Sequence, residues 1–184
     1  MRRLFLLRHA QASLVEEGLT DFDRPLSPDG RRMAEALAAR LVADGIVPDH
    51  ILCSSARRTR ETLAILLPHL PGEPKIRLTR RLYDDAGGDY CSLIGMLGEG
   101  KCLMVVGHNP AIAATLARLG GKGRSAQGDQ GAQLRRLAEK FPPAGLATIE
   151  FDADNWADIA PQGGLLVAFL DSRSPLDRAD EAEQ

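Results

Sequence analysis

Two histidines in the sequence come directly after apolar, strand-like runs. Residues 4–7 are followed by Arg8 and His9, and residues 103–106 are followed, one position later, by His108. Ligands of an open α/β sheet bind at the carboxyl ends of its strands, so we expect both imidazoles at one edge of a sheet. The residue types and their places therefore indicate a candidate site at that edge.

Arginines follow a third apolar run. The run 51–53 ends at Ser54, and the predicted helix after it carries Arg57, Arg58 and Arg60. A histidine at a strand end is commonly a capping residue, and an arginine-rich helix start is usually solvated, so neither feature alone indicates a site. Together, two imidazoles and at least two guanidiniums at one edge suit a doubly charged, oxygen-rich anion, because arginine offers paired donors to phosphate. Phosphate is the natural candidate ligand.

The hydrophobic pattern predicts the elements that must position these residues. Apolar runs bounded by turn residues predict strands at 4–7, 51–53, 76–78, 102–106, 147–151 and 165–170, of which 76–78 is the weakest. Helical periodicity predicts helices at 28–45 (with Ser27 as N-cap and Pro28 at N1), 57–67, 90–97, 110–119 and 134–141. Alternation of strands and helices favours a mainly parallel sheet covered on both faces. The last two strands follow each other without a helix, which favours an antiparallel pair at one edge.

Composition and charge narrow the class of protein. The 184 residues suit one domain over 1–175, followed by a frayed acidic tail at 176–184. A formal net charge of −2 argues against a nucleic-acid partner, and no apolar run approaches a membrane span. We therefore expect a cytoplasmic monomer with neither a membrane nor a nucleic-acid partner.

The glycine-rich stretch 120–131 is expected to be a mobile loop. The three cysteines, odd in number and without CxxC spacing, are expected to be free thiols.

Three motifs, in order along the chain, resemble those of the histidine phosphatase superfamily. They are Leu7-Arg8-His9-Ala10, then Ser54 followed by Arg58 and Thr62 at steps of four, then Gly107-His108-Asn109-Pro110. The chain resembles the compact SixA-type phosphohistidine phosphatases more narrowly in Arg24-Pro25-Leu26 followed by Gly30, and in Lys140-Phe141-Pro142-Pro143. The resemblance extends over nearly the whole chain. It implies a phosphoglycerate mutase-like fold, a three-layer α/β/α sandwich around a mainly parallel sheet with an antiparallel edge strand.

The resemblance also implies roles for individual residues. His9 would be the nucleophile, taking the phosphoryl group to form a covalent phosphohistidine. Arg8 and Arg58 would hold the phosphoryl oxygens, with a protonated His108 opposite them. Such a fixed cationic ring can stabilise the transition state in place of a metal, so neither a metal nor another cofactor is required. Nearby guanidiniums should disfavour the imidazolium form of His9 and keep this side chain neutral.

Two further positions are implied, each with an open alternative. Asp84 matches the acidic position of the family best and would protonate the leaving group, although Asp85 is adjacent and either carboxylate could instead cap the next helix. A phosphohistidine substrate would make an acid less important, because imidazole is a good leaving group. Arg24 could bind substrate at the pocket rim, but we favour a structural role in holding the loop after His9.

Arg58 is preferred to the neighbouring arginines because of its spacing. It shares one column at the helix start with Ser54 and Thr62, at i, i+4 steps. Arg57 and Arg60 would then point elsewhere, as surface charges.

The motifs together predict a metal-independent phosphatase that acts in signal transduction on a phosphohistidine of a protein partner. One alternative is a phosphatase for a small phosphate ester, and another is a phosphate-binding module without turnover. A metallohydrolase that uses His9 and His108 has less support, because the sequence lacks HxH or HxxxH ligand spacing.

Overall fold

All six predicted strands are present and belong to one sheet. The computed structural model describes residues 1–15, 17–121, 136–137 and 139–171. Within them the strand order is β3-β2-β4-β1-β6-β7-β5. Strands β1 to β4 run parallel, whereas β6 runs antiparallel to both β1 and β7. The bounds are β1 (Arg2–Arg8), β2 (His50–Ser54), β3 (Lys75–Thr79), β4 (Cys102–Gly107), β5 (Gly120–Gly121), β6 (Gly145–Phe151) and β7 (Gly164–Asp171).

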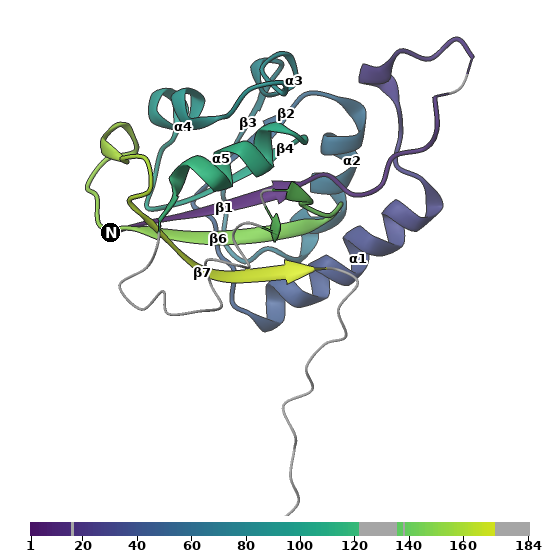
Figure 1. Cartoon of the computed structure of the whole chain (residues 1–184). Helices are drawn as coiled ribbons and strands as arrows, with labels where there is room; N and C mark the ends of the chain where they lie inside the picture. Colours follow the sequence, from purple (N-terminus) through teal and green to yellow (C-terminus); the bar gives the residue numbers. More distant parts are fainter. Residues whose placement is uncertain (16, 122–135, 138, 172–184) are drawn as a thin grey trace, which may run out of the picture.

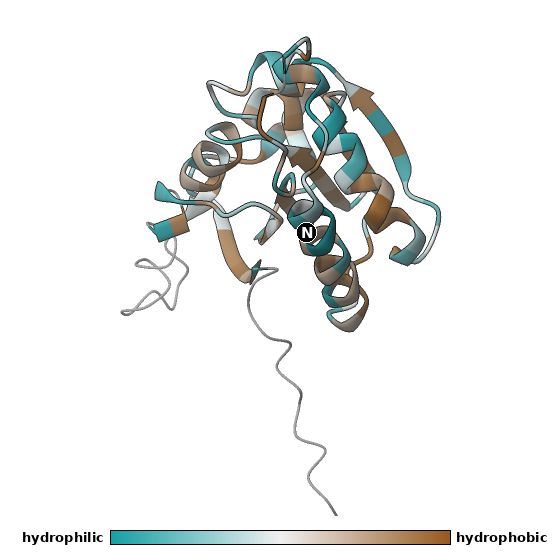
Figure 2. Ribbon diagram, turned by 90° about the vertical axis from the view of Figure 1, so that its right-hand side faces the viewer, coloured by the Kyte–Doolittle hydropathy of each residue, from teal (hydrophilic) through white to brown (hydrophobic). Residues whose placement is uncertain are grey.

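Helices cover both faces of this sheet, which gives the three layers expected of the fold (Figure 1). Helices α1 (Pro28–Ala43) and α2 (Arg57–Leu66) pack on one face, and α4 (Cys91–Leu97) and α5 (Ala111–Leu119) pack on the other. Figure 2 shows that the helices carry hydrophobic and hydrophilic residues on different sides. Shorter elements are α3 (Arg81–Asp84), η1 (Asp21–Asp23), η2 (Leu67–His69) and η3 (Trp156–Asp158).

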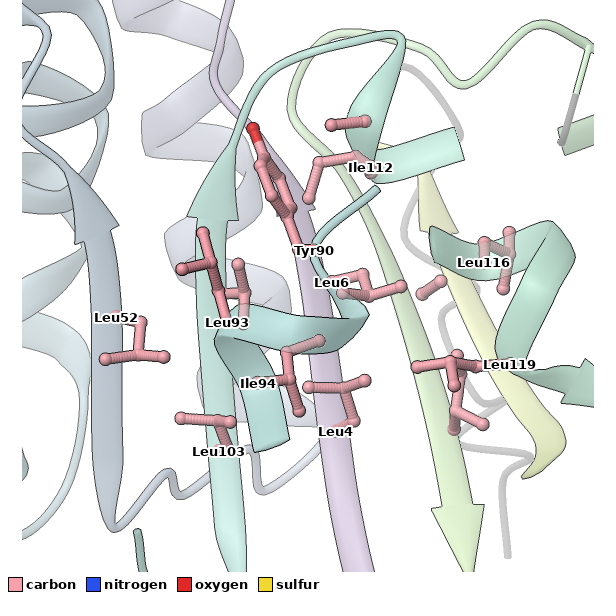
Figure 3. Close-up of a cluster of buried hydrophobic side chains, with 14 of the residues drawn as sticks. Leu4, Leu6, Leu52, Tyr90, Leu93, Ile94, Leu103, Ile112, Leu116 and Leu119 are labelled. Atoms are coloured by element: carbon pink, nitrogen blue, oxygen red, sulfur yellow. The ribbon is translucent and has the colours of Figure 1, made fainter. Parts of the chain in front are cut away.

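Alternate residues of the central strand β1 face the two helical layers. Leu4 and Leu6 belong to the core on the side of α4 and α5, whereas Phe5 and Leu7 belong to the core on the side of α1 and α2. Figure 3 shows Leu4 and Leu6 in one cluster with Ile94 of α4 and with Ile112 and Leu116 of α5. All four β1 side chains are buried, and the burial of each contributes about 1.5–3 kcal/mol to stability. Burial on both faces explains the uninterrupted apolar run that predicted this strand.

Helix α1 begins as its sequence predicts. Ser27 is the N-cap, and its hydroxyl accepts a hydrogen bond from the backbone N–H of Gly30 at 3.0 Å, while Pro28 occupies the first turn. The Gln11 carbonyl accepts the backbone N–H of Ser27 at 2.9 Å. This contact ties the loop that follows His9 to the start of the helix.

Replacing Gly30 by alanine should lower the free energy of unfolding by roughly 3 kcal/mol, because the site has no room for a methyl group. An added Cβ would lie 1.9 Å from the Gln11 carbonyl oxygen, which is backbone and cannot rotate away. Urea unfolding at neutral pH measures the loss. The control is Gly87→Ala, where a Cβ meets nothing within 4 Å. Equal stabilities of the two variants would contradict the predicted clash.

Some expectations need correction or lie outside the described residues. Gly120 and Gly121 form the short strand β5, parallel to β7, where a loop was expected. The rest of the glycine-rich stretch and the tail 176–184 are outside the described residues. Of the helix predicted at 134–141, residues 136, 137 and 139 are helical, whereas 134, 135 and 138 are not described. In the part of the chain that the structure covers, no helix is long and apolar enough to cross a membrane.

Candidate active site

His9 lies just beyond the carboxyl end of β1. Its backbone N–H donates to the Gly107 carbonyl at the end of β4 (3.1 Å), so the two central strands fix its position. The ring Nδ1 is 2.7 Å from the Ala10 carbonyl oxygen, which only accepts hydrogen bonds, so Nδ1 carries the proton. Nε2 therefore holds a lone pair, and Arg58 Nε donates to it at 3.2 Å. The nitrogen that faces the arginine is the one able to act as a nucleophile.

The His9 ring is neutral over the physiological pH range. Removal of water from around the ring lowers its pKa to about 3, and the charges of His108, Arg58 and Arg8 add to that effect. A neutral His9 was predicted correctly. The main cause is burial, however, and the guanidiniums are secondary.

Arg8 and Asn109 converge on one backbone carbonyl. Arg8 Nη1 donates to the Phe141 carbonyl oxygen at 2.7 Å, and Asn109 Nδ2 donates to the same oxygen at 3.1 Å. Arg8 Nε is buried and has no hydrogen-bond partner among the described residues. Phe141 thus fixes one end of the guanidinium, while another N–H stays available for an oxygen of a ligand.

Arg58 is held from the first turn of α2. It is only 7% exposed, and besides His9 it contacts Asp21 of η1: Nη1 donates to the Asp21 carbonyl at 2.5 Å and Nη2 to its Oδ2 at 3.1 Å. A guanidinium has five N–H donors, so these three contacts leave two for a ligand. One turn further on, Thr62 donates to the Arg58 carbonyl (2.7 Å) and accepts the Ala10 N–H (3.1 Å). This threonine joins α2 to the loop after His9.

Ser54 is the last residue of β2 and does not belong to α2. The prediction that it shares one helical column with Arg58 and Thr62 is therefore wrong. The Ser54 hydroxyl instead lies 2.8 Å from His108 Nε2. A hydroxyl can donate or accept, so it fits either protonation state of that nitrogen. Arg57 and Arg60 are exposed, as predicted, and contact Glu61 and the Ser55 carbonyl respectively.

His108 faces His9, with their ring centroids 5.1 Å apart. Burial lowers the pKa of His108 to about 4, and the charge of Arg58 contributes. The protonated state expected from the sequence is therefore wrong for the unliganded protein. Within the described residues, its buried Nδ1 has no hydrogen-bond partner. A phosphate dianion placed beside the ring would favour the imidazolium form.

Asp84 lines a pocket beside these groups, together with Arg58 and His108; the pocket has a volume of about 530 Å³. Its carboxylate is exposed and lies 3.4 Å from Arg80 Nε. Asp85 is the C-cap of α3 and is not among the pocket residues. The carboxylate at the start of α4 is that of Asp89, which accepts the backbone N–H of Cys91, so neither predicted aspartate caps that helix.

Arg24 holds the loop and does not line this pocket. Its Nε and Nη2 donate to the Ser13 carbonyl at 3.0 and 2.7 Å, and its Nη1 pairs with Asp21 Oδ1 at 2.8 Å. The contacts of Arg24 therefore fit the structural alternative, and they do not place its guanidinium where a substrate would bind.

Sequence reasoning missed two pocket residues, Tyr83 and Asp21. The Tyr83 ring meets the His108 ring edge-on at 5.6 Å, and its hydroxyl donates to Asp21 Oδ2 at 3.0 Å. Although desolvation raises the pKa of Asp21, hydrogen bonds from Arg24, Tyr83 and Arg58 and the charge of Arg58 lower it to about 2. Asp21 is thus a fixed anion beside Arg58. Asp21 belongs to none of the three motifs, so the sequence offered little to identify it as a site residue.

Comparison with known proteins identifies the family of this chain. Residues 4–93 match the model of the histidine phosphatase superfamily (branch 1). An uncharacterized protein of Mycobacterium tuberculosis is 37% identical over 164 residues, which cover 89% of this chain and 98% of that protein. The solved structure of a protein from Agrobacterium tumefaciens, provisionally named phosphohistidine phosphatase SixA, is 30% identical and has a TM-score of 0.72. The match covers 95% of this chain and 98% of the Agrobacterium tumefaciens chain. The chain belongs to the histidine phosphatase superfamily.

A second solved structure, from Nakamurella multipartitia and also provisionally named SixA, is 30% identical with a TM-score of 0.74. The match covers 92% of this chain and 95% of the Nakamurella multipartitia chain. This histidine phosphatase is therefore of the SixA-type branch, with the phosphoglycerate mutase-like α/β fold, and it is a hydrolase of phosphorylated substrates. The resemblance carried by the motifs is confirmed.

The buried imidazoles predict that this histidine phosphatase loses stability in acid. His9 and His108 have an ordinary pKa of 6.5, lowered in the folded protein to about 3 and about 4, so between about pH 6.5 and pH 4 the unfolded chain gains more of their protons than the folded protein does. The free energy of unfolding should fall by about 1 kcal/mol per pH unit for each imidazole between pH 6 and 4.5. Burial lowers the pKa of His50 too, which adds to the slope.

Urea unfolding over this pH range measures the slope. The variant His9→Asn should show a shallower slope than the wild type. If the free energy of unfolding of His9→Asn falls with pH as steeply as that of the wild type, His9 has the same pKa in the folded and the unfolded chain.

Proposed function

We propose that this phosphatase works without a metal, through a covalent phosphohistidine at His9 Nε2. The observation that carries the proposal is the fixed tautomer of His9: Nδ1 donates to the Ala10 carbonyl, and the Nε2 lone pair faces Arg58. A neutral imidazole held in this way attacks phosphorus without a separate base. Arg8 and Arg58 would bind the phosphoryl oxygens from one side and His108 from another.

The reaction has two steps. In the first, the Nε2 lone pair forms a bond to phosphorus while the bond from phosphorus to the leaving atom breaks. The leaving group departs with that electron pair. An alkoxide oxygen takes a proton, which we assign to a protonated Asp84, whereas the imidazole of a phosphohistidine leaves as a neutral ring because its other nitrogen carries the proton. In the second, a water oxygen attacks phosphorus and gives its proton to the Asp84 carboxylate when Asp84 has given one up, and otherwise to solvent. The P–N bond breaks, its electrons return to Nε2, and inorganic phosphate is released.

Charge stabilisation is the main task of the protein in such a transfer. The guanidiniums of Arg8 and Arg58 are held by Phe141 and Asp21, so their donors are in place before the substrate arrives. Donors fixed in advance need no reorganisation as negative charge develops on the phosphoryl oxygens. His108 is neutral before binding and gains a proton when the dianion raises its pKa.

We propose a phosphohistidine on a partner protein, within a signal transduction pathway, as the substrate. The relatives of the SixA-type branch support this choice by their names. Imidazole is a good leaving group, so protonation of the leaving group by the exposed Asp84 matters less for this substrate. A small phosphate ester is the second candidate substrate, and the pocket of about 530 Å³ is large enough for one.

The decisive experiment is to trap the intermediate. Wild-type protein is mixed with 4-nitrophenyl phosphate in excess EDTA and quenched in alkali, in which a phosphohistidine is stable. We expect hydrolysis to continue in EDTA, and mass spectrometry to place an acid-labile phosphoryl group on His9. The mechanism would be refuted if activity were lost in EDTA and recovered on adding a divalent ion. It would also be refuted if the phosphoryl group were found on another residue. Phosphate binding without turnover of any substrate would favour the binding-module alternative.

A competition assay separates the two substrate classes. A phosphohistidine-containing protein and a panel of phosphorylated metabolites are offered together, and release from each is followed. Preference for the phosphoprotein supports the proposal, whereas preference for a metabolite supports the alternative.

A further inference from the structure

The pocket beside the phosphate-binding groups contains two carboxylates. Asp21 of η1 and Asp84 of α3 line it together with Arg58, His108 and Asn109. Arg58 and His108 both contact His9, so this space adjoins the proposed phosphoryl site, and we place the leaving group there. The inference drawn from this arrangement rests on the proposed function, because it assumes a phosphoryl group at His9 Nε2.

We propose that Asp21 is a specificity-determining residue, whose carboxylate selects against leaving groups that carry a negative charge. Three donors fix this carboxylate: Arg24 on Oδ1 at 2.8 Å, and Arg58 and Tyr83 on Oδ2 at 3.1 and 3.0 Å. A group held from three directions cannot swing away from an approaching anion. It stays ionised throughout the pH range of activity, because these contacts lower its pKa to about 2.

Two cations, Arg24 and Arg58, pair with Asp21 and offset part of its charge, but their other donors are used elsewhere. The remaining donors of Arg58 are directed at the phosphoryl oxygens, as proposed above. Arg24 places its Nε and Nη2 on the Ser13 carbonyl and does not line the pocket. The Arg80 guanidinium lies over the Phe22 ring, 4.7 Å from its centroid, and pairs with Asp84. A negative charge on the leaving group therefore meets the Asp21 carboxylate, and the described residues that line this pocket offer it no lysine or arginine besides Arg58.

The pocket also contains hydrogen-bond acceptors besides Asp21. Asn109 Oδ1 is buried and has no hydrogen-bond partner within the described part of the chain. The residue Asn109 lines the same pocket as Asp21 and Asp84. A leaving group that offers N–H donors, such as imidazole, suits these oxygens better than one that offers only further oxygens. The same residues therefore favour neutral or cationic nitrogen leaving groups.

Two substrates that differ by one charge test the inference. They are 3-carboxyphenyl phosphate and 3-carbamoylphenyl phosphate, which have leaving phenols of similar shape and acidity. Asp21 is 47% exposed, so water screens its field, and we expect wild-type kcat/KM to favour the carbamoyl substrate by about threefold to tenfold. In Asp21→Asn this ratio should fall to near one. Loosening of Arg58 in the variant slows both substrates alike and cancels in the ratio.

The matched control is Asp23→Asn, which changes the same charge at an exposed position of the same short helix, outside the pocket. It should keep the wild-type ratio. If Asp21→Asn is too slow to assay, raising the salt from about 20 mM to about 500 mM should reduce the wild-type ratio instead. A ratio that neither Asp21→Asn nor salt changes, or a wild-type preference for the carboxylate, overturns the inference alone. Failure to hydrolyse either substrate overturns the proposed function as well.

Discussion

Replacing His9 by asparagine should lower kcat for 4-nitrophenyl phosphate by at least about 10³-fold, because the variant has no nucleophile at the Nε2 position. The asparagine amide can still donate to the Ala10 carbonyl, as His9 Nδ1 does at 2.7 Å, so the loop keeps its hydrogen bond. The loss should lie in kcat, measured by phosphate release in steady state. Single-turnover mixing should also show no phosphorylated protein.

A control and a binding measurement make this result decisive. His69→Asn changes an exposed histidine in η2 and should keep wild-type activity. Calorimetry should show that His9→Asn still binds inorganic phosphate within about fivefold of the wild-type affinity, because Arg8, Arg58 and His108 remain in place. An active His9→Asn variant would refute the covalent mechanism. An inactive one that also fails to bind phosphate would point to a collapsed site.

The apolar runs predicted the sheet well because its central strands are buried on both faces. In β1 and β4, side chains such as Leu6 and Val105 face one helical layer while their neighbours face the other, which produces uninterrupted runs. Parallel strands bring their carboxyl ends to one edge, so the order of the runs was enough to predict that His9 and His108 lie together. Topology alone accounts for this part of the site.

Features that depend on short elements could not be predicted. Strand β5 consists of two glycines, which carry no side chain and so no apolar signal. Helix α3 has four residues, too few to show a helical period, yet it places Asp84 in the pocket and brings Tyr83 against His108. The contact of Asp21 with Arg58 joins positions 37 apart in the chain and has no local signature.

Protonation was the least predictable property of the site. Nearby guanidiniums led us to expect a neutral His9, whereas the protonated state of His108 was implied by the resemblance. Burial dominates in both cases and lowers the pKa of each ring, so both are neutral before a ligand binds. The amount of water removed from a ring depends on the packed structure, which spacing along the chain does not reveal.

Replacing Arg58 by lysine should lower kcat/KM for 4-nitrophenyl phosphate by about 10²- to 10³-fold, although the charge is kept. Arg58 uses one planar group to donate to His9 Nε2 and to the Asp21 carbonyl and carboxylate. A lysine ammonium is a single point and cannot make this set of contacts while also meeting two phosphoryl oxygens. The nucleophile would lose a neighbour that orients it, and the transition state would lose paired donors.

The neighbouring Arg57 provides the control. Arg57→Lys makes the same chemical change on the same helix, at an exposed residue whose partner is Glu61 at 2.8 Å, and should keep activity within about twofold of the wild type. Both variants are assayed in steady state after circular dichroism has confirmed that each is folded. If Arg58→Lys keeps more than about a third of wild-type kcat/KM, charge alone accounts for the role of this residue and the fixed geometry does not. A large loss confined to Arg58→Lys assigns the effect to the directed donors of the guanidinium.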